Sequence, residues 1–244
     1  MGLIRSPRHT AEDLEAWARW ERYDRMLADD RSLARQTERA QRIVQEFVAD
    51  GPCHVGVSWG KDSVVVAHLA VTAGVDAPLV WARADRAENP DCVLVRDAFL
   101  AQYPQARYEE RMYSWRVPLR GEPGFHDSPG QDALGETLPG RYVSGVRAAE
   151  SGRRRVAMCR HGETSASTCR PIGWWPHELV WAYLEMHGLP VHPAYGCTWG
   201  GRIDRSVVRV HALRTAVGDM EWEGWYYPDE AASLGWVRTR LAGD

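Results

Sequence analysis

The chain has 244 residues, of which 30 are lysine or arginine and 33 are aspartate or glutamate, so its net charge is −3. This balance excludes the global positive field of a non-specific nucleic-acid binder, although a local basic cleft is still allowed. No apolar run is long enough to cross a membrane, and five cysteines without a framework spacing, together with an amino terminus that lacks a hydrophobic core, predict a cytoplasmic protein.

Two amphipathic helices are predicted within residues 1–50, as a helical extension before the main domain. Thr10–Leu27 has apolar residues at helical spacing, with Thr10 as the amino-terminal cap and Asp13 three residues later. Ser32–Ala49 follows with a second apolar face. The sequence leaves open whether these helices pack beside the sheet of the main domain or against a second subunit in a homodimer.

The chain is organised around Ser58–Ser63, which reads Ser-Trp-Gly-Lys-Asp-Ser. It lies between an apolar strand, Cys53–Val57, and a helix predicted over Asp62–Ala73. A tight loop at a helix amino terminus offers unpaired amides and the positive end of the helix dipole, so it favours an anion such as phosphate. Lys61 is the only lysine in the chain, which favours a compact ammonium acting on phosphate. The loop is not a Walker loop, because three residues separate its glycines and Asp62 follows the lysine.

Strands and helices then alternate, which predicts a parallel sheet covered by helices on both faces. Pro78–Ala84 and Ala106–Tyr113 are predicted strands, and Asn89–Tyr103 is a predicted helix with Asn89 as its cap. Because ligands bind at the carboxyl ends of parallel strands, Arg83–Arg86 is expected at the same edge as the loop. Residues 114–140 are rich in glycine and proline and are predicted to form either a mobile lid or a disordered segment.

The second half of the chain carries a further strand and helix and then loses its periodicity. Arg141–Val146 is a predicted strand, and Pro176–His187 is a clearly delimited helix. Between them, Arg153–Arg155 is either a solvated turn or a group that faces an anion, and its place after a strand end and next to Glu150 favours the second reading. Residues 196–244 are predicted to be a carboxy-terminal extension packed on the same domain, with a short helix near Asp204–Ala216.

Three blocks of the sequence resemble one protein family. The loop is similar to the Ser-Gly-Gly-Lys-Asp-Ser loop of PP-loop ATP pyrophosphatases, with Trp59 in place of the first glycine. Two further blocks, Gly145–Ser151 (Gly-Val-Arg-Ala-Ala-Glu-Ser) and Arg170–Tyr195, resemble those of phosphoadenosine phosphosulfate (PAPS) reductase-like proteins. The blocks cover residues 53–195 with gaps, and the chain resembles in particular the short, arginine-rich members from actinobacteria and their phages.

The resemblance implies an α/β, adenine-nucleotide α-hydrolase-like (Rossmann-like) fold, a three-layer sandwich with a parallel sheet over residues 51–195. ATP would place its β- and γ-phosphates in the loop and its adenine against the backbone of Val80–Arg83, and Asp62 would cap the loop or hold Mg²⁺. The bulk of Trp59 is expected to tighten or occlude the phosphate site. The resemblance assigns nucleotide binding to Ser58, Trp59, Gly60, Lys61, Asp62, Ser63, Arg83, Gly145, Arg147, Glu150 and Arg153, and catalysis to Lys61, Asp62 and Arg147.

The reaction implied by the resemblance is attack on the α-phosphate of ATP, with pyrophosphate leaving and the acceptor adenylated. Preorganised donors would stabilise the charge that pyrophosphate gains. A PAPS reductase-type activity is the alternative, and the sequence argues against it, because no cysteine follows Cys197 where those enzymes carry a nucleophilic thiol. A non-catalytic nucleotide-binding module is a third reading.

Three cysteines, Cys159, Cys169 and Cys197, flank the segment expected near the nucleotide. Free cysteine is commonly a small apolar filler, so three unrelated thiols are one reading. The others are a thiol that carries sulfur to an adenylated acceptor, or three ligands of an iron–sulfur cluster. Arginines at Arg153–Arg155 and Arg202–Arg209 could contact the phosphates of a nucleic-acid acceptor, and a sulfur-donor protein would be a second partner.

Overall fold

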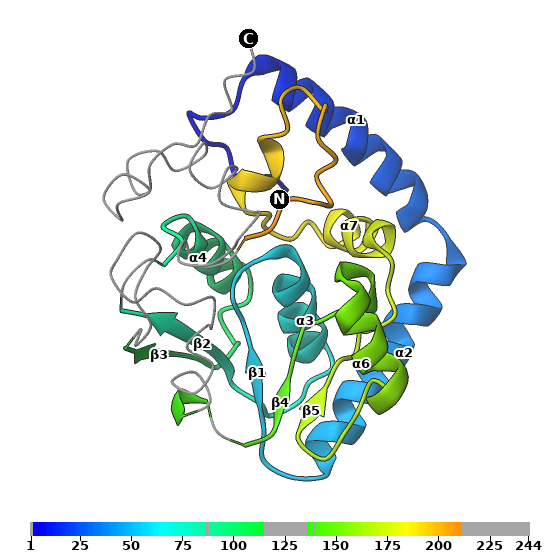
Figure 1. The fold of residues 1–244 in the computed structure, drawn as a ribbon, viewed down its shortest axis with the longest axis vertical. Coiled ribbons are helices and arrows are strands. Elements are labelled where there is room, and N and C mark those ends of the chain that lie inside the picture. The colour runs from blue at the N-terminus through cyan, green and yellow to red at the C-terminus, as the bar shows by residue number, and fades with distance from the viewer. Residues whose placement is uncertain (1, 86–87, 115–135, 139, 211–244) are drawn as a thin grey trace.

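The computed structural model describes residues 2–85, 88–114, 136–138 and 140–210. Its sheet has five parallel strands in the order β3-β2-β1-β4-β5. Figure 1 shows the helices arranged around this sheet. In chain order the helices and strands are α1 (Ala11–Ala28), α2 (Arg31–Ala49), β1 (His54–Gly56), α3 (Lys61–Thr72), β2 (Leu79–Ala84), α4 (Cys92–Gln102), β3 (Tyr108–Tyr113), β4 (Tyr142–Val143), η1 (Ala148–Glu150), α6 (Gly152–His161), β5 (Thr168–Cys169), α7 (His177–Met186) and η2 (Pro193–Gly196).

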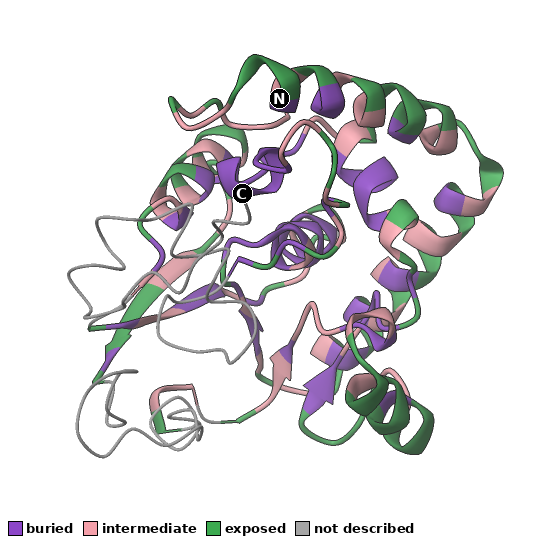
Figure 2. Cartoon of the chain, turned by 45° about the horizontal axis from the view of Figure 1, so that its top comes forward, coloured by how far each residue is buried: buried purple, intermediate pink, exposed green. Residues whose placement is uncertain are grey.

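The predicted α/β class is confirmed, because every pairing in the sheet is parallel and helices lie between β1 and β2, between β2 and β3, and between β4 and β5. The most buried helix is α3, which follows the predicted phosphate loop. Its run Val64–Ala67 is fully buried, so tertiary packing overrides the weak helix propensity of three successive valines. Figure 2 shows α3 buried along nearly its whole length, whereas α1 and α2 are buried on one side.

The two amino-terminal helices form as predicted and pack on the same chain. Thr10 caps α1: its side chain accepts from the Asp13 amide, and the Asp13 carboxylate accepts from the Thr10 amide. The helix α1 packs against α7, and α2 packs against α3. The pair therefore lies beside the sheet domain, the first of the two arrangements that the sequence allowed.

Several predicted boundaries are corrected. The helix expected from Asn89 begins at Cys92, because the Asn89 side chain accepts from the Asp91 amide and closes a turn instead. The arginines at Arg153–Arg155 lie in the first turns of α6, not in a turn. No helix forms over 204–210, and the rest of that predicted helix, like most of the 114–140 loop, lies outside the described residues. No helix in the described ranges is long and apolar enough to span a membrane.

Candidate nucleotide-binding site

The predicted phosphate loop is a tight turn closed by its own side chains. The Ser63 hydroxyl accepts from the Ser58 amide at 3.2 Å and donates to the Gly60 carbonyl oxygen at 3.0 Å. Gly60 is the amino-terminal cap of α3 and has no side chain to satisfy the first-turn amides. Within the described residues, the Asp62 and Ser63 amides form no hydrogen bond, so they are available to an anion at the helix terminus.

Trp59 faces the core instead of the phosphate site, which corrects the expectation that it would occlude the loop. Its backbone has a φ of 61°, and this left-handed conformation turns the indole inward. The ring is fully buried and lies 5.7 Å from the rings of Phe99 and Tyr108. Tryptophan therefore anchors the turn from below, and its side chain is not available to a ligand.

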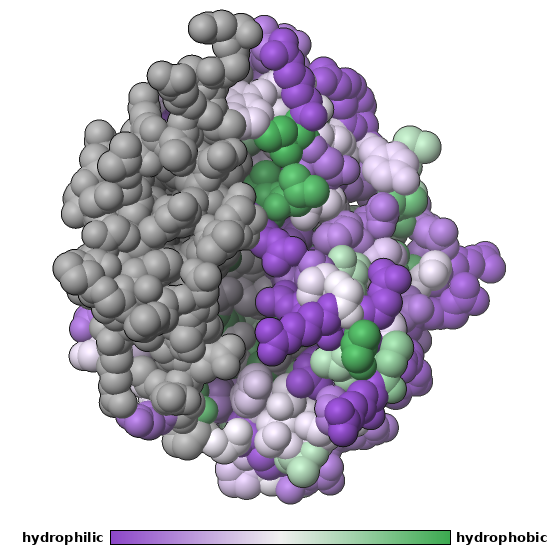
Figure 3. Space-filling view, in the orientation of Figure 1, coloured by the Kyte–Doolittle hydropathy of each residue, from purple (hydrophilic) through white to green (hydrophobic). Residues whose placement is uncertain are grey.

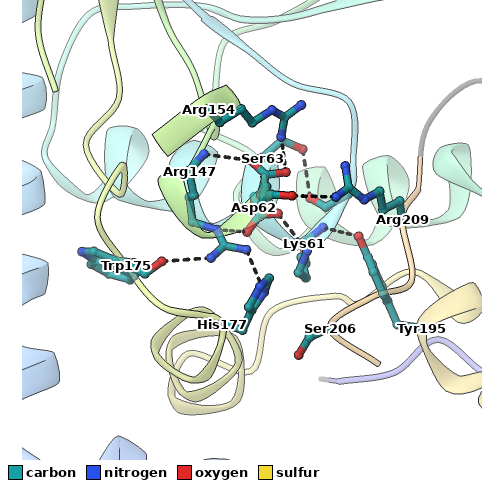
Figure 4. Close-up of polar contacts among 12 residues, drawn as sticks. Lys61, Asp62, Ser63, Arg147, Arg154, Trp175, His177, Tyr195, Ser206 and Arg209 are labelled. Carbon is teal, nitrogen blue, oxygen red and sulfur yellow. Dashed lines mark hydrogen bonds and ion pairs between the residues drawn. The ribbon is translucent and has the colours of Figure 1, made fainter. Parts of the chain in front are cut away.

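Lys61, Asp62 and Arg147 form a cluster of buried charge below the loop (Figure 4). One carboxylate oxygen of Asp62 accepts from the Lys61 ammonium at 2.9 Å and the other accepts from Arg147 Nε at 2.7 Å. Burial alone raises the pKa of Asp62, but the two cations outweigh it and hold that pKa below its usual value. The carboxylate is therefore ionised and holds the ammonium at the loop.

Arg147, which the motif predicted to face the nucleotide, is buried beneath the loop and does not line the cavity described below. Its side chain is 0% exposed, and the guanidinium donates to the Trp175 carbonyl oxygen at 2.9 Å and to His177 Nδ1 at 3.2 Å as well as to Asp62. Burial and the Arg147 charge lower the pKa of His177, which keeps the accepting nitrogen free of a proton. Arg147 thus acts on the loop through Asp62.

Gly145 lets the strand β4 approach the loop closely. A Cβ at this position would lie 2.9 Å from the backbone carbon and oxygen of Asp62, a distance that no side chain can occupy. The glycine of the second motif block is therefore required by packing against the start of α3. Its backbone also lines the cavity described next.

A cavity of about 750 Å³ extends from the loop across the sheet. It is lined by residues of three strands, including Gly56, Ala82 and Tyr142, and by the loop residues Ser58, Gly60, Lys61, Asp62 and Ser63. Val80, Trp81 and Ala82, from the segment predicted to contact adenine, also line it. A cavity of this size is within the range of small-molecule and nucleotide sites.

Glu150 organises another part of the cavity wall. Its carboxylate accepts from the Arg147 amide at 2.7 Å and pairs with the Arg154 guanidinium, and its carbonyl oxygen accepts from Arg209 Nη2 at 2.7 Å. Arg154 and Arg209 both line the cavity. Arg153 is exposed and is not among the lining residues, so the predicted contact shifts by one residue along α6.

Two further predicted contacts, of Arg83 with the nucleotide and of Asp62 with Mg²⁺, do not fit the positions of these side chains. Arg83 does not line the cavity; its guanidinium pairs with Glu110 at 2.9 Å and lies over the Trp81 ring. Asp62 was expected to hold Mg²⁺, but both of its oxygens are already bound to cations. No group of three or more potential metal ligands gathers among the described residues.

The three cysteines do not come together. Cys159 is exposed on α6, while Cys169 is buried in β5 and Cys197 is buried after η2. Burial raises the pKa of Cys169 to about 12, so this thiol is inert at neutral pH. The three therefore do not form the ligand set of an iron–sulfur cluster in this structure.

The residues assigned to nucleotide binding from the sequence did not include Arg154, Tyr195 and Arg209, which line the cavity. Glu150 at the end of η1 and Arg154 in α6 are four residues apart and form an ion pair. Tyr195, the last residue of the third motif block, is 2% exposed, and its hydroxyl accepts from the Lys61 amide at 3.3 Å. Arg209 was named only as part of the Arg202–Arg209 cluster, as a possible contact to a nucleic acid, because its place in the cavity depends on tertiary contacts.

No protein-family model matches the chain. Among curated proteins, the chain is similar to PAPS reductases from Xanthomonas axonopodis pv. citri and Xanthomonas campestris pv. campestris, each with 33% identity over 67 residues. The match covers 28% of this chain and 28% of the length of each reductase.

Two solved structures are also similar. A PAPS reductase from Candida auris has a TM-score of 0.49 and 12% identity, and the match covers 77% of this chain and 98% of the other. The U34-tRNA thiolase NcsA from Methanococcus maripaludis, solved with its 4Fe–4S cluster, has a TM-score of 0.42 and 14% identity, with 82% and 76% covered. The chain is thus similar to PAPS reductases over 67 residues, and its parallel sheet agrees with the α/β class that the three motif blocks implied.

Proposed function

We propose that the protein binds ATP with its β- and γ-phosphates at Ser58–Ser63 and transfers the adenylyl group to an acceptor. The observation that carries this proposal is the loop itself: free first-turn amides, a helix terminus without a side-chain cap and an ammonium bound by Asp62 lie at one end of the cavity. ATP would bring Mg²⁺ as its own counterion, held by phosphates and water.

The chemistry follows from where charge develops. As an acceptor nucleophile bonds to the α-phosphorus, the bond from that phosphorus to the bridging oxygen breaks and pyrophosphate leaves. The leaving group gains negative charge at the loop, where the Lys61 ammonium and the Asp62 and Ser63 amides are already oriented. Donors that need no reorganisation stabilise such a transition state most strongly.

The test is product identity. The wild-type protein with ATP, Mg²⁺ and candidate acceptors should release pyrophosphate and not orthophosphate, and Lys61→Ala should lose this activity. ATP binding without pyrophosphate or AMP from any acceptor would instead favour a nucleotide sensor. The reductase alternative predicts thiol-dependent reduction of PAPS, and among the described residues that line the cavity none is a cysteine.

The face of α6 supports a nucleic-acid acceptor. The helix carries four arginines and one histidine and no acidic residue, and Arg153, Arg155 and Arg160 are exposed. Figure 3 shows hydrophilic side chains beside apolar ones over this helix, and Arg154, between Arg153 and Arg155, lines the cavity. Trp174 is 47% exposed and offers a ring on which a base can stack.

Salt dependence tests the nucleic-acid acceptor. Binding of a tRNA or single-stranded RNA should weaken steeply with salt, and replacing Arg153, Arg155 and Arg160 by Gln should lower the log–log slope by roughly two to three. An unchanged slope in this triple variant would remove the α6 face as the contact surface. ATP binding should stay unchanged in the same variant, which separates the two sites.

A further inference from the structure

Residues 197–210, which we call the strap, run from η2 to the cavity. Figure 1 shows this segment in orange beside α1. At its end, Arg209 and Val210 line the cavity. The Val210 carbonyl oxygen would lie 3.5 Å from a Cβ on Gly60, the cap of α3. The strap is thus a wall of the nucleotide pocket and contacts the phosphate loop directly, although it lies beyond all three motif blocks.

The first anchor of the strap is a buried carboxylate on α1. One oxygen of Asp13 accepts from the amides of Thr198 and Gly200 at 3.0 and 2.9 Å, while the other caps α1 at Thr10. The strap turns sharply around this carboxylate, with positive φ at Trp199 and the two glycines that follow. These amide bonds also outweigh the effect of burial and hold the pKa of Asp13 below its usual value.

The second anchor is an ion pair between Asp24 on α1 and Arg205 on the strap. Arg205 Nη2 lies 2.5 and 2.6 Å from the two carboxylate oxygens, and each side chain is 4% exposed. The guanidinium carbon lies 4.3–5.2 Å from the centroids of three indole rings, those of Trp17, Trp20 and Trp181. Desolvation offsets much of the attraction in such a pair, so its best use is to fix one arrangement.

Only three residues separate Arg205, in this anchor, from Arg209, which lines the cavity. After Arg205 a turn is closed by the Val207 amide on the Asp204 carbonyl oxygen at 3.1 Å, and the Val208 side chain is 3% exposed. The next side chain, Arg209, donates to the Glu150 carbonyl oxygen. A displacement of the anchored arginine would therefore move Arg209 with it.

We propose that Asp24 and Arg205 are positioning residues for the nucleotide site: they hold the strap so that the Arg209 guanidinium stays on Glu150 and faces the cavity. The amino-terminal helix α1 then helps to position the wall of the pocket. The effect on ligand affinity rests on the proposed function, because it takes ATP as the ligand. The anchoring itself does not.

The test is a double-mutant cycle between Asp24→Asn and Arg209→Met, with the dissociation constant for ATP–Mg²⁺ measured by calorimetry. Each single change should weaken binding roughly fivefold, and Asp24→Asn should add less than about twofold in the Arg209→Met background, because coupled residues are not additive. Glu15→Gln, which removes an exposed acid from the same helix, is the matched control and should leave binding unchanged. Hydrogen exchange of the strap amides should rise in Asp24→Asn.

The outcomes separate the alternatives. Additive losses in affinity, or a lower unfolding midpoint with unchanged affinity, would overturn the positioning role. If Asp24→Asn does not fold, Arg205→Lys replaces it in the cycle, since it keeps the charge but loses the planar contact with the tryptophans. If the wild type binds no ATP, the proposed function fails, and exchange of the strap amides alone decides the anchoring: unchanged protection in the variant would contradict it.

Discussion

The molecule buries two clusters of charge, and they differ in what they face. Lys61, Asp62 and Arg147 carry an excess positive charge, and Lys61 and Asp62 line the cavity. Asp24 and Arg205 form a neutral pair enclosed by tryptophan rings, with no part in the lining. The first cluster offers its charge to a ligand, whereas the second uses its charge only within the protein.

This difference shows that burial of a charged side chain does not by itself indicate what the side chain does. Both arginines are almost fully buried and both bind a carboxylate, yet we assign one to the phosphate loop and the other to the placement of a wall. The two pairs differ in their surroundings. The carboxylate of Asp62 also binds the Lys61 ammonium at the loop, whereas the guanidinium of Arg205, which binds Asp24, lies against tryptophan rings. The predictions below test that separation.

The largest effect is expected when Arg147 is replaced. Arg147→Met leaves the Trp175 carbonyl oxygen, His177 Nδ1 and one oxygen of Asp62 without their donor, so the free energy of unfolding should fall by about 3–5 kcal/mol. Urea unfolding at pH 7 measures it. Arg39→Met, which breaks an exposed pair with Glu163, should cost at most about 1 kcal/mol. An equally small loss in Arg147→Met would contradict its structural role.

The next prediction concerns two buried histidines, His68 and His192, whose burial should make the stability of the protein depend on pH. Burial lowers the pKa of His68 and of His192 to about 3, from a usual value near 6.5. The unfolded chain therefore binds more protons below pH 6.5, and stability should fall as the pH falls, by about 2 kcal/mol for each histidine between pH 7 and pH 5.

Unfolding at both pH values checks this. His68→Gln should lose about 2 kcal/mol less than the wild type over that interval, and the exposed His161→Gln is the control. The same pH dependence in His68→Gln and in the wild type would show that this ring does not titrate on unfolding.

The smallest effect is expected when the enclosed pair is replaced as a whole. Asp24→Leu with Arg205→Met fills the same space with apolar groups, and such replacements are often neutral or stabilising. Unfolding free energy should stay within about 1 kcal/mol of the wild type or rise, and affinity for ATP should change less than about threefold. A large loss of affinity in this stable variant would mean that the charge, not the anchoring, matters at the strap.

Local sequence signals predicted most of the fold and one end of the site. The capping box at Thr10 and the strand–loop–helix around Lys61 depend on neighbours within a few residues, so they are readable from the sequence. The inward turn of Trp59 and the burial of Arg147 were not predictable, because each depends on packing against distant elements. The position of Arg209 depends on a turn in which the amides of Thr198 and Gly200 bind Asp13, which lies 185 and 187 residues earlier in the chain.

The central claim is that the loop binds the polyphosphate of ATP, and a calorimetric titration of ATP–Mg²⁺ with pyrophosphate as competitor tests it most directly. Pyrophosphate should compete with ATP, and Lys61→Met should weaken both ligands by roughly ten- to a hundredfold, since a charge-assisted contact contributes about 1.5–3 kcal/mol. Full affinity in Lys61→Met, or ATP binding that pyrophosphate does not displace, would contradict the assignment.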